Sequence, residues 1–111
     1  MAYDEDLARR IRALMSDTEG VTERKMFGGL AFLVKGNMAI AASSHGGLLV
    51  RVDPAQTDEL LSSPGVQLME MRGRPMPGWL RVPADSVATD PELSAWVTRS
   101  TTYVLTLLPK L

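Results

Sequence analysis

The histidine at position 45 is the first residue to consider for chemistry, because it is the only one in the chain and an unperturbed imidazole titrates near neutral pH. It follows Ser43 and Ser44 and precedes two glycines. A serine nucleophile needs an imidazole within hydrogen-bonding reach, an orienting acid and an oxyanion hole, which neighbours in a turn do not supply. The segment is typical of an exposed turn, so we expect no catalytic role for His45.

Phosphate, metal and acid–base chemistry have no clear motif either. Gly28 and Gly29 lack the Lys-Ser/Thr of a P-loop, and a glycine pair within β structure marks a bulge or a close backbone approach. The absence of cysteine and the single histidine exclude cysteine-ligated and His-His zinc sites. Asp85 and Asp90 could hold a hard cation but lack EF-hand spacing. The carboxylates also lack the apolar neighbours that favour acid catalysis, so we predict no catalytic residue, no metal and no cofactor.

Arginines provide the best candidate for binding. Arg72 and Arg74 lie in the Gly- and Pro-rich segment 72–78, which predicts a flexible loop between two strands. Met76 and nearby methionines add adaptable apolar surface, which favours a protein partner. Direct nucleic-acid binding is the alternative, although two tryptophans offer few rings for base stacking. A second candidate surface lies on the exposed side of the predicted sheet, around Arg24 and Arg51. In the nucleic-acid alternative, Arg24 and Lys25 would add to the contacts of Arg72 and Arg74.

The elements that position these residues begin with an amphipathic helix over residues 4–16. Asp4 is its expected N-cap, and its apolar face is formed by Leu7, Ile11, Leu14 and Met15. Alternating apolar residues then predict an antiparallel meander, with a tight turn at Gly36-Asn37. The predicted strands cover residues 22–27, 30–35, 38–42 and 48–52.

Two Asp-Pro pairs, Asp53-Pro54 and Asp90-Pro91, predict helix starts with aspartate as the N-cap. Two more strands, residues 66–71 and 78–82, lie between these helices, and the last helix has an apolar face that includes Trp96 and extends to Leu107. The fold class is therefore α+β, with an antiparallel sheet and helices packed on one face, in the order α-β(3–4)-α-β(2)-α.

Length and composition indicate one domain over residues 1–111, since 45% of the residues are hydrophobic and no linker is evident. The 12 basic and 13 acidic side chains give no overall field that attracts nucleic acid or an acidic membrane. No apolar run is long enough to span a membrane, and the first residues are charged where a signal peptide needs apolar ones. We therefore expect a cytoplasmic protein without membrane contact.

Several motifs together resemble the N-terminal domain of the TfoX/Sxy competence regulators, from about residue 8 to 105. They are Lys25-Met26-Phe27-Gly28-Gly29-Leu30, Gly36-Asn37-Met38, the segment 47–53, Met76-Pro77-Gly78-Trp79 and Trp96. The resemblance implies a secretion-chaperone-like α+β arrangement and a stand-alone form without the C-terminal domain of full-length members. Those members are linked to activation of DNA-uptake genes together with a cyclic-AMP receptor protein.

These observations predict a non-enzymatic regulatory or adaptor module that acts through protein contacts. The partner's identity, and whether the chain forms a homodimer, stay open. The segment Met26–Gly29 is expected to be structural, with Phe27 buried and Gly28 or Gly29 in a backbone conformation that a Cβ would disfavour.

Overall fold

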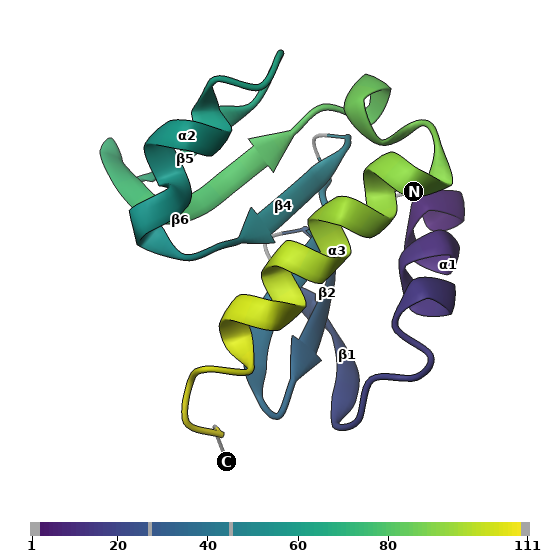
Figure 1. Cartoon of the computed structure of the whole chain (residues 1–111). Helices are drawn as coiled ribbons and strands as arrows, with labels where there is room; N and C mark the ends of the chain where they lie inside the picture. Colours follow the sequence, from purple (N-terminus) through teal and green to yellow (C-terminus); the bar gives the residue numbers. More distant parts are fainter. Residues whose placement is uncertain (1–2, 27, 45, 110–111) are drawn as a thin grey trace.

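The computed structural model describes residues 3–26, 28–44 and 46–109. Within these residues the chain forms three α-helices and six β-strands (Figure 1). The helices are α1 (Glu5–Leu14), α2 (Thr57–Leu61) and α3 (Asp90–Val104). The strands are β1 (Val21–Met26), β2 (Gly29–Val34), β3 (Asn37–Ala42), β4 (Leu48–Arg51), β5 (Gln67–Met71) and β6 (Arg74–Val82). Short 3-10 turns, η1 (Pro54–Gln56) and η2 (Ala84–Val87), precede α2 and α3.

The strands form a single antiparallel sheet in the order β1-β2-β3-β4-β6-β5. The first four strands are the predicted meander, because each pairs with the next along the chain. β6 then pairs with β4, which places β5 at the edge opposite β1. The predicted α+β class and element order are therefore confirmed.

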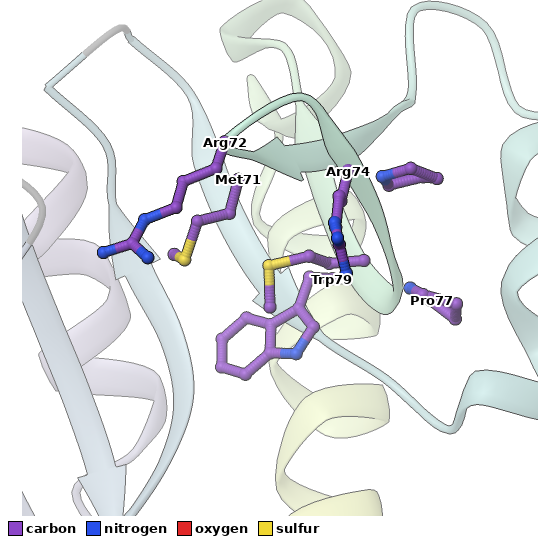
Figure 2. A pocket seen from close by; sticks show the side chains of 7 residues that line it. Met71, Arg72, Arg74, Pro77 and Trp79 are labelled. Carbon is purple, nitrogen blue, oxygen red and sulfur yellow. The ribbon is translucent and has the colours of Figure 1, made fainter.

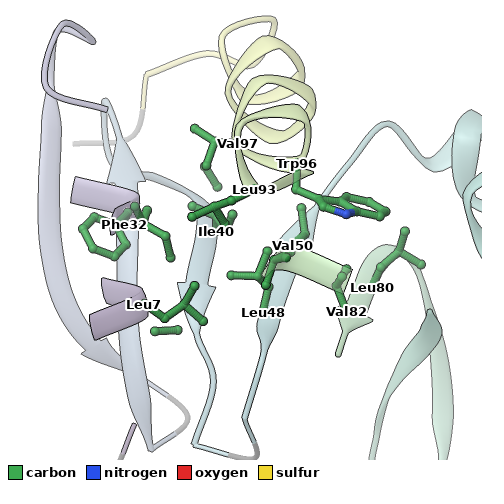
Figure 3. Close-up of a cluster of buried hydrophobic side chains, with 14 of the residues drawn as sticks. Leu7, Phe32, Ile40, Leu48, Val50, Leu80, Val82, Leu93, Trp96 and Val97 are labelled. Carbon is green, nitrogen blue, oxygen red and sulfur yellow. The ribbon is translucent and has the colours of Figure 1, made fainter. Parts of the chain in front are cut away.

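The helices pack on one face of this sheet, as the sequence predicts. Residues from α1, α2 and α3 join one buried cluster with alternate strand residues. Figure 3 shows Leu93, Trp96 and Val97 of α3 facing Ile40 and Val50 of the sheet. Every second residue of a strand points to the same side, so this cluster uses the strand positions that include Phe32, Ile40, Leu48, Val50, Leu80 and Val82.

The opposite side of the sheet carries a second, smaller buried cluster. Its members are Ala31, Leu33, Met38, Ala41, Leu49 and Met69, with Met26 and Trp79 packed against them. Within the described residues no helix contributes to this cluster, and we call this side the helix-free face. The members are nevertheless buried.

The helix starts differ in one case from the prediction. Asp4 caps α1 by accepting hydrogen bonds from the backbone N–H groups of Asp6 and Leu7, as expected. Asp53 also caps as expected, with its carboxylate accepting from the N–H of Ala55 at the start of η1. Asp90, in contrast, is the first residue of α3, and Thr89 is its N-cap.

The Thr89 cap is a reciprocal capping box. Thr89 Oγ1 accepts from the N–H of Glu92 at 3.4 Å, and a Glu92 carboxylate oxygen accepts from the N–H of Thr89 at 3.2 Å. The prediction for Asp90 was wrong because Pro91 is tolerated at either of the first two helical positions, which allows a start one residue earlier. Two further expectations were also wrong, since Leu14 of the expected apolar face is exposed and α3 ends before Leu107.

We expect Thr89→Ala to lower the free energy of unfolding by about 1 kcal/mol, because the N–H of Glu92 loses its acceptor and the Glu92 carboxylate loses the hydroxyl that donates to it at 2.8 Å. Asp90→Ala is the matched control. Its exposed carboxylate accepts from the Arg10 guanidinium at 3.2 Å, so the loss should stay within about 0.5 kcal/mol. Urea denaturation of both variants measures the difference, and a larger loss for Asp90→Ala would contradict the assigned cap.

The glycine pair sits at the turn between β1 and β2. Gly28 has φ +78°, a conformation that a Cβ disfavours, which confirms the expectation for this pair. Gly29 is constrained differently, because a Cβ there would lie 2.2 Å from the carbonyl oxygen of Ala42 on β3. The prediction that Phe27 is buried falls outside the described residues.

Candidate functional site

The hairpin of β5 and β6 contains the two arginines that the sequence selects for binding. The predicted loop over residues 72–78 is wrong, because β6 starts at Arg74 and the connection is the two-residue turn Arg72-Gly73. Both turn residues have positive φ, +55° and +76°, which is the geometry that joins twisted antiparallel strands most tightly. Arg72 and Arg74 are therefore held on a hairpin rather than on a flexible loop.

The two prolines of β6 fit this strand because its pairing is irregular there. Leu68 pairs with Leu80, whereas Glu70 pairs with Pro75, so extra residues of β6 bulge out between these pairs. A bulge tolerates proline, which cannot donate a ladder hydrogen bond. Gly78 has φ +86° in this bulge.

The backbone of Gly78 forms hydrogen bonds that connect the bulge to neighbouring elements. Its N–H donates to Thr57 Oγ1 at 2.9 Å in a buried position, and its carbonyl accepts from the N–H of Val52 at 2.7 Å. A Cβ on residue 78 would lie 2.9 Å from the Val52 carbonyl oxygen. These bonds fix the base of the hairpin against β4 and α2.

A hollow of about 700 Å³ lies against the hairpin (Figure 2). The side chains of Met71, Arg74 and Trp79 point into the same space beneath the turn. Its lining residues combine thioethers, proline rings, an indole and two guanidinium groups: Met71, Arg72, Arg74, Pro75, Met76, Pro77 and Trp79. No carboxylate is among them, so the hollow is apolar in its walls and positive at its rim.

Trp79 connects this hollow to the centre of the sheet. The Arg51 guanidinium carbon lies 5.0 Å from the centroid of the Trp79 ring and 5.8 Å from that of Tyr103 on α3. Such cation–π contacts hold the guanidinium without neutralising its charge. Arg51 therefore adds a positive charge at the end of β4, next to Trp79 and the end of α3.

The arginines of the strands are concentrated on the helix-free face. Arg24 pairs with Ala31, Arg81 with Leu49 and Arg74 with Met71, and paired residues point to the same side of an antiparallel sheet. Ala31 and Leu49 belong to the helix-free cluster, and Met71 lines the hollow with Trp79. Within the described residues this face thus carries four arginines, Arg24, Arg51, Arg74 and Arg81.

Carboxylates are absent from the same face of the described strands. These strands contain two acidic residues, Glu23 and Glu70. Glu23 pairs with Phe32 of the helix-side core, and Glu70 follows Met69 of the helix-free cluster, so alternation places both on the helix side. The chain is close to neutral as a whole, yet its two faces differ in charge.

Glu23 also has a cation of its own. Its carboxylate accepts hydrogen bonds from Arg12 of α1, at 2.6 Å from Nε and 2.7 Å from the terminal nitrogen. These bonds lower the pKa of the Glu23 carboxyl group below its ordinary value. Within the described residues the ion pairs are Arg9–Asp6, Arg10–Asp90 and Arg12–Glu23, and none of them neutralises an arginine of the helix-free face.

The structure brings most of the predicted binding residues together. Arg24 and Arg51 lie on the helix-free face, and Arg72, Arg74 and Met76 line the hollow at its end. Lys25 is the exception, because it pairs with Leu30 of the helix-side core and so alternates onto the other face. Arg81, which the sequence groups with Arg72 and Arg74 as local positive charge, also lies on this face. Sequence reasoning did not select Trp79 as a binding residue, although its alternation with the buried Leu80 could have suggested it.

The remaining candidates do not form a second site in the part of the chain that is described. His45 lies outside the described residues, so its predicted role as a turn residue is untested. No three acidic or histidine side chains among the described residues are grouped closely enough to hold a metal ion. None of the described helices has the length and apolar character needed to cross a membrane.

Comparison with known proteins identifies one family. Searches of curated proteins and of solved structures return no match. The family model described as the TfoX N-terminal domain matches residues 13–103, which is most of the chain and includes all six described strands and nearly all of α3. The protein therefore belongs to the TfoX N-terminal domain family.

Proposed function

We propose that this protein is a non-enzymatic regulatory module that binds a protein partner through the helix-free face of its sheet. Membership of the TfoX N-terminal domain family supports a regulatory role. The observation that carries the proposal is the separation of charge, since four arginines and no carboxylate share this face of the described strands. The partner surface is accordingly acidic, because buried like charges would oppose binding.

The chemistry between the arginines favours a protein over a nucleic acid. Three methionine side chains from two strands, Met26 of β1 and Met69 and Met71 of β5, lie on this face and can adapt to an irregular partner surface. A stacking platform for bases needs several accessible rings. Among the described strands, Trp79 provides the one aromatic ring on this face, and the Arg51 guanidinium lies over that ring.

The test is affinity capture from the source cell, followed by purification of the captured protein and re-formation of the complex. We expect the double variant Arg72→Ser/Arg74→Ser to weaken this complex about tenfold or more, because arginines at the centre of interfaces commonly carry more than 1 kcal/mol each. Its melting temperature should change little, since both side chains are exposed and make no ion pair among the described residues.

A matched control removes the same charge elsewhere. Arg9→Ser/Lys25→Ser takes two exposed cations from α1 and from the helix side of β1. The control should leave affinity within about twofold, because distant exposed charges act weakly through solvent. Equal loss in both variants would mean that net charge alone drives binding, and undiminished binding of the hairpin variant would exclude this face.

A further inference from the structure

The hollow under the β5–β6 hairpin is an open depression with a largely apolar lining. Its volume of about 700 Å³ falls in the range typical of ligand pockets. Met71 is 38% exposed, one of few large apolar side chains left open among the described residues, and it lies at this hollow. An apolar group of a partner would therefore cover Met71, Met76 and the open part of Trp79.

The hollow is also formed in advance of binding. The two-residue turn, the prolines at positions 75 and 77 and the bonds of Gly78 to Thr57 and Val52 restrict the hairpin backbone. A ligand that enters such a site loses less free energy in ordering the protein than a ligand that must order a loop. The site therefore suits a flexible ligand, which bears most of the ordering cost itself.

The charges around the hollow define the flanks of that ligand. Arg72 and Arg74 lie at the rim, and Arg51 and Arg81 lie beyond Trp79 along β4 and β6. Guanidinium groups bind carboxylates in a bidentate manner, so acidic groups on both sides of an apolar group would match this pattern.

We infer that the hollow binds an acidic linear peptide segment, with an apolar side chain seated on Met71 and Trp79 and flanking carboxylates paired with the arginines. This inference rests on the proposed function and deepens it by naming the anchor of the protein contact. The thioether and proline lining favours an aliphatic or aromatic side chain over a nucleobase, because a single indole cannot stack successive bases.

The test uses fluorescence anisotropy with labelled probes of defined chemistry. The main probe is a fluorescein-labelled Glu-rich peptide with a central Leu-Phe pair. In the second probe this pair is Ser-Ser, in the third lysine replaces glutamate, and the fourth is an oligothymidylate of equal charge. We expect the first probe to bind about tenfold or more tightly than the Ser-Ser peptide, since seating one apolar side chain contributes at least that factor.

The location is read from the indole N–H signals of the two tryptophans in a nitrogen–proton correlation spectrum. The Trp79 signal should move when the first probe binds, whereas the signal of Trp96, buried on α3 in the helix-side core, should stay in place. Met71→Ser should reduce binding of the Leu-Phe peptide about fivefold or more but leave the Ser-Ser peptide unaffected. Leu14→Ser is the matched control, because Leu14 has the same 38% exposure on α1.

Four outcomes would overturn the inference. Stronger binding of the oligothymidylate would point to a nucleic acid. Equal binding of the lysine peptide would show that the ligand need not be acidic. An unmoved Trp79 signal would show that the peptide does not bind in this hollow. In the fourth outcome, none of the probes binds while the variant Arg72→Ser/Arg74→Ser still loses binding of the captured cellular partner. That result would reject a linear peptide as the ligand, but it would still support the proposed function.

Discussion

Replacement of Phe32 by alanine should lower the free energy of unfolding by about 3–5 kcal/mol, the largest loss expected for a single side chain here. The Phe32 ring is fully buried on β2, in the cluster that α1 and α3 share with the sheet (Figure 3). Its removal would leave a cavity beneath helices that cannot collapse without losing their other contacts. Urea denaturation of the purified variant measures the loss.

Leu14→Ala provides the comparison for Phe32→Ala. Leu14 lies on the solvent side of α1 and is 38% exposed, so its truncation should cost less than about 1 kcal/mol. Similar losses for the two variants would mean that the helices do not bury the β2 face as described.

Gly29→Ala should destabilise the protein by about 2–3 kcal/mol, through contact rather than through backbone conformation. The added Cβ would lie 2.2 Å from the Ala42 carbonyl oxygen and 3.2 Å from the Ser44 backbone nitrogen. Both atoms belong to the backbone, so β2 and the end of β3 would have to separate. The shift should appear in urea denaturation and as displaced amide signals along β3.

Gly28→Ala separates the two kinds of constraint in the same turn. Among the described residues a Cβ there would meet the Ser44 side chain, at 3.0 Å from Oγ, and the cost arises mainly from φ +78°. We expect a loss of about 1 kcal/mol. A greater loss at Gly28 than at Gly29 would contradict the close approach of β2 and β3.

The order of elements could be predicted because each element leaves a local signal. The alternation of Leu48, Val50 and Val52 indicates a strand, and the spacing of Leu93, Trp96 and Val97 indicates a helical face. Both patterns reflect burial on the helix side, which the structure confirms. Local signals also placed the glycine pair at a turn.

The hairpin was misread because its features are not local. Two prolines and two glycines in the segment 72–78 are typical of a loop, and nothing near them indicates a bulged strand. The bulge depends on Thr57 and Val52, whose bonds to Gly78 form only after β4 and α2 have come alongside. No pattern within the hairpin sequence contains that information.

The binding face was only partly predictable for a related reason. Alternation within β1 puts Arg24 beside Met26, and alternation within β4 puts Arg51 with Leu49. The register between strands decides whether these side chains lie on the same face of the sheet. In addition, β6 lies between β4 and β5, which differs from their order in the chain. The grouping of the arginines therefore emerged only from the pairing of the strands.

The strand order also has a consequence for folding. β1 to β4 can form as successive hairpins, and β5 with β6 as a separate hairpin, because each of these pairings joins neighbours in the chain. The ladder between β4 and β6 joins residues far apart, such as Leu48 and Val82, so its formation requires the slow closure of a long loop. Arg24 and Arg51 belong to the first unit, and Arg74 and Arg81 to the second. A chain still emerging from the ribosome would therefore lack the complete arginine face until this last docking step.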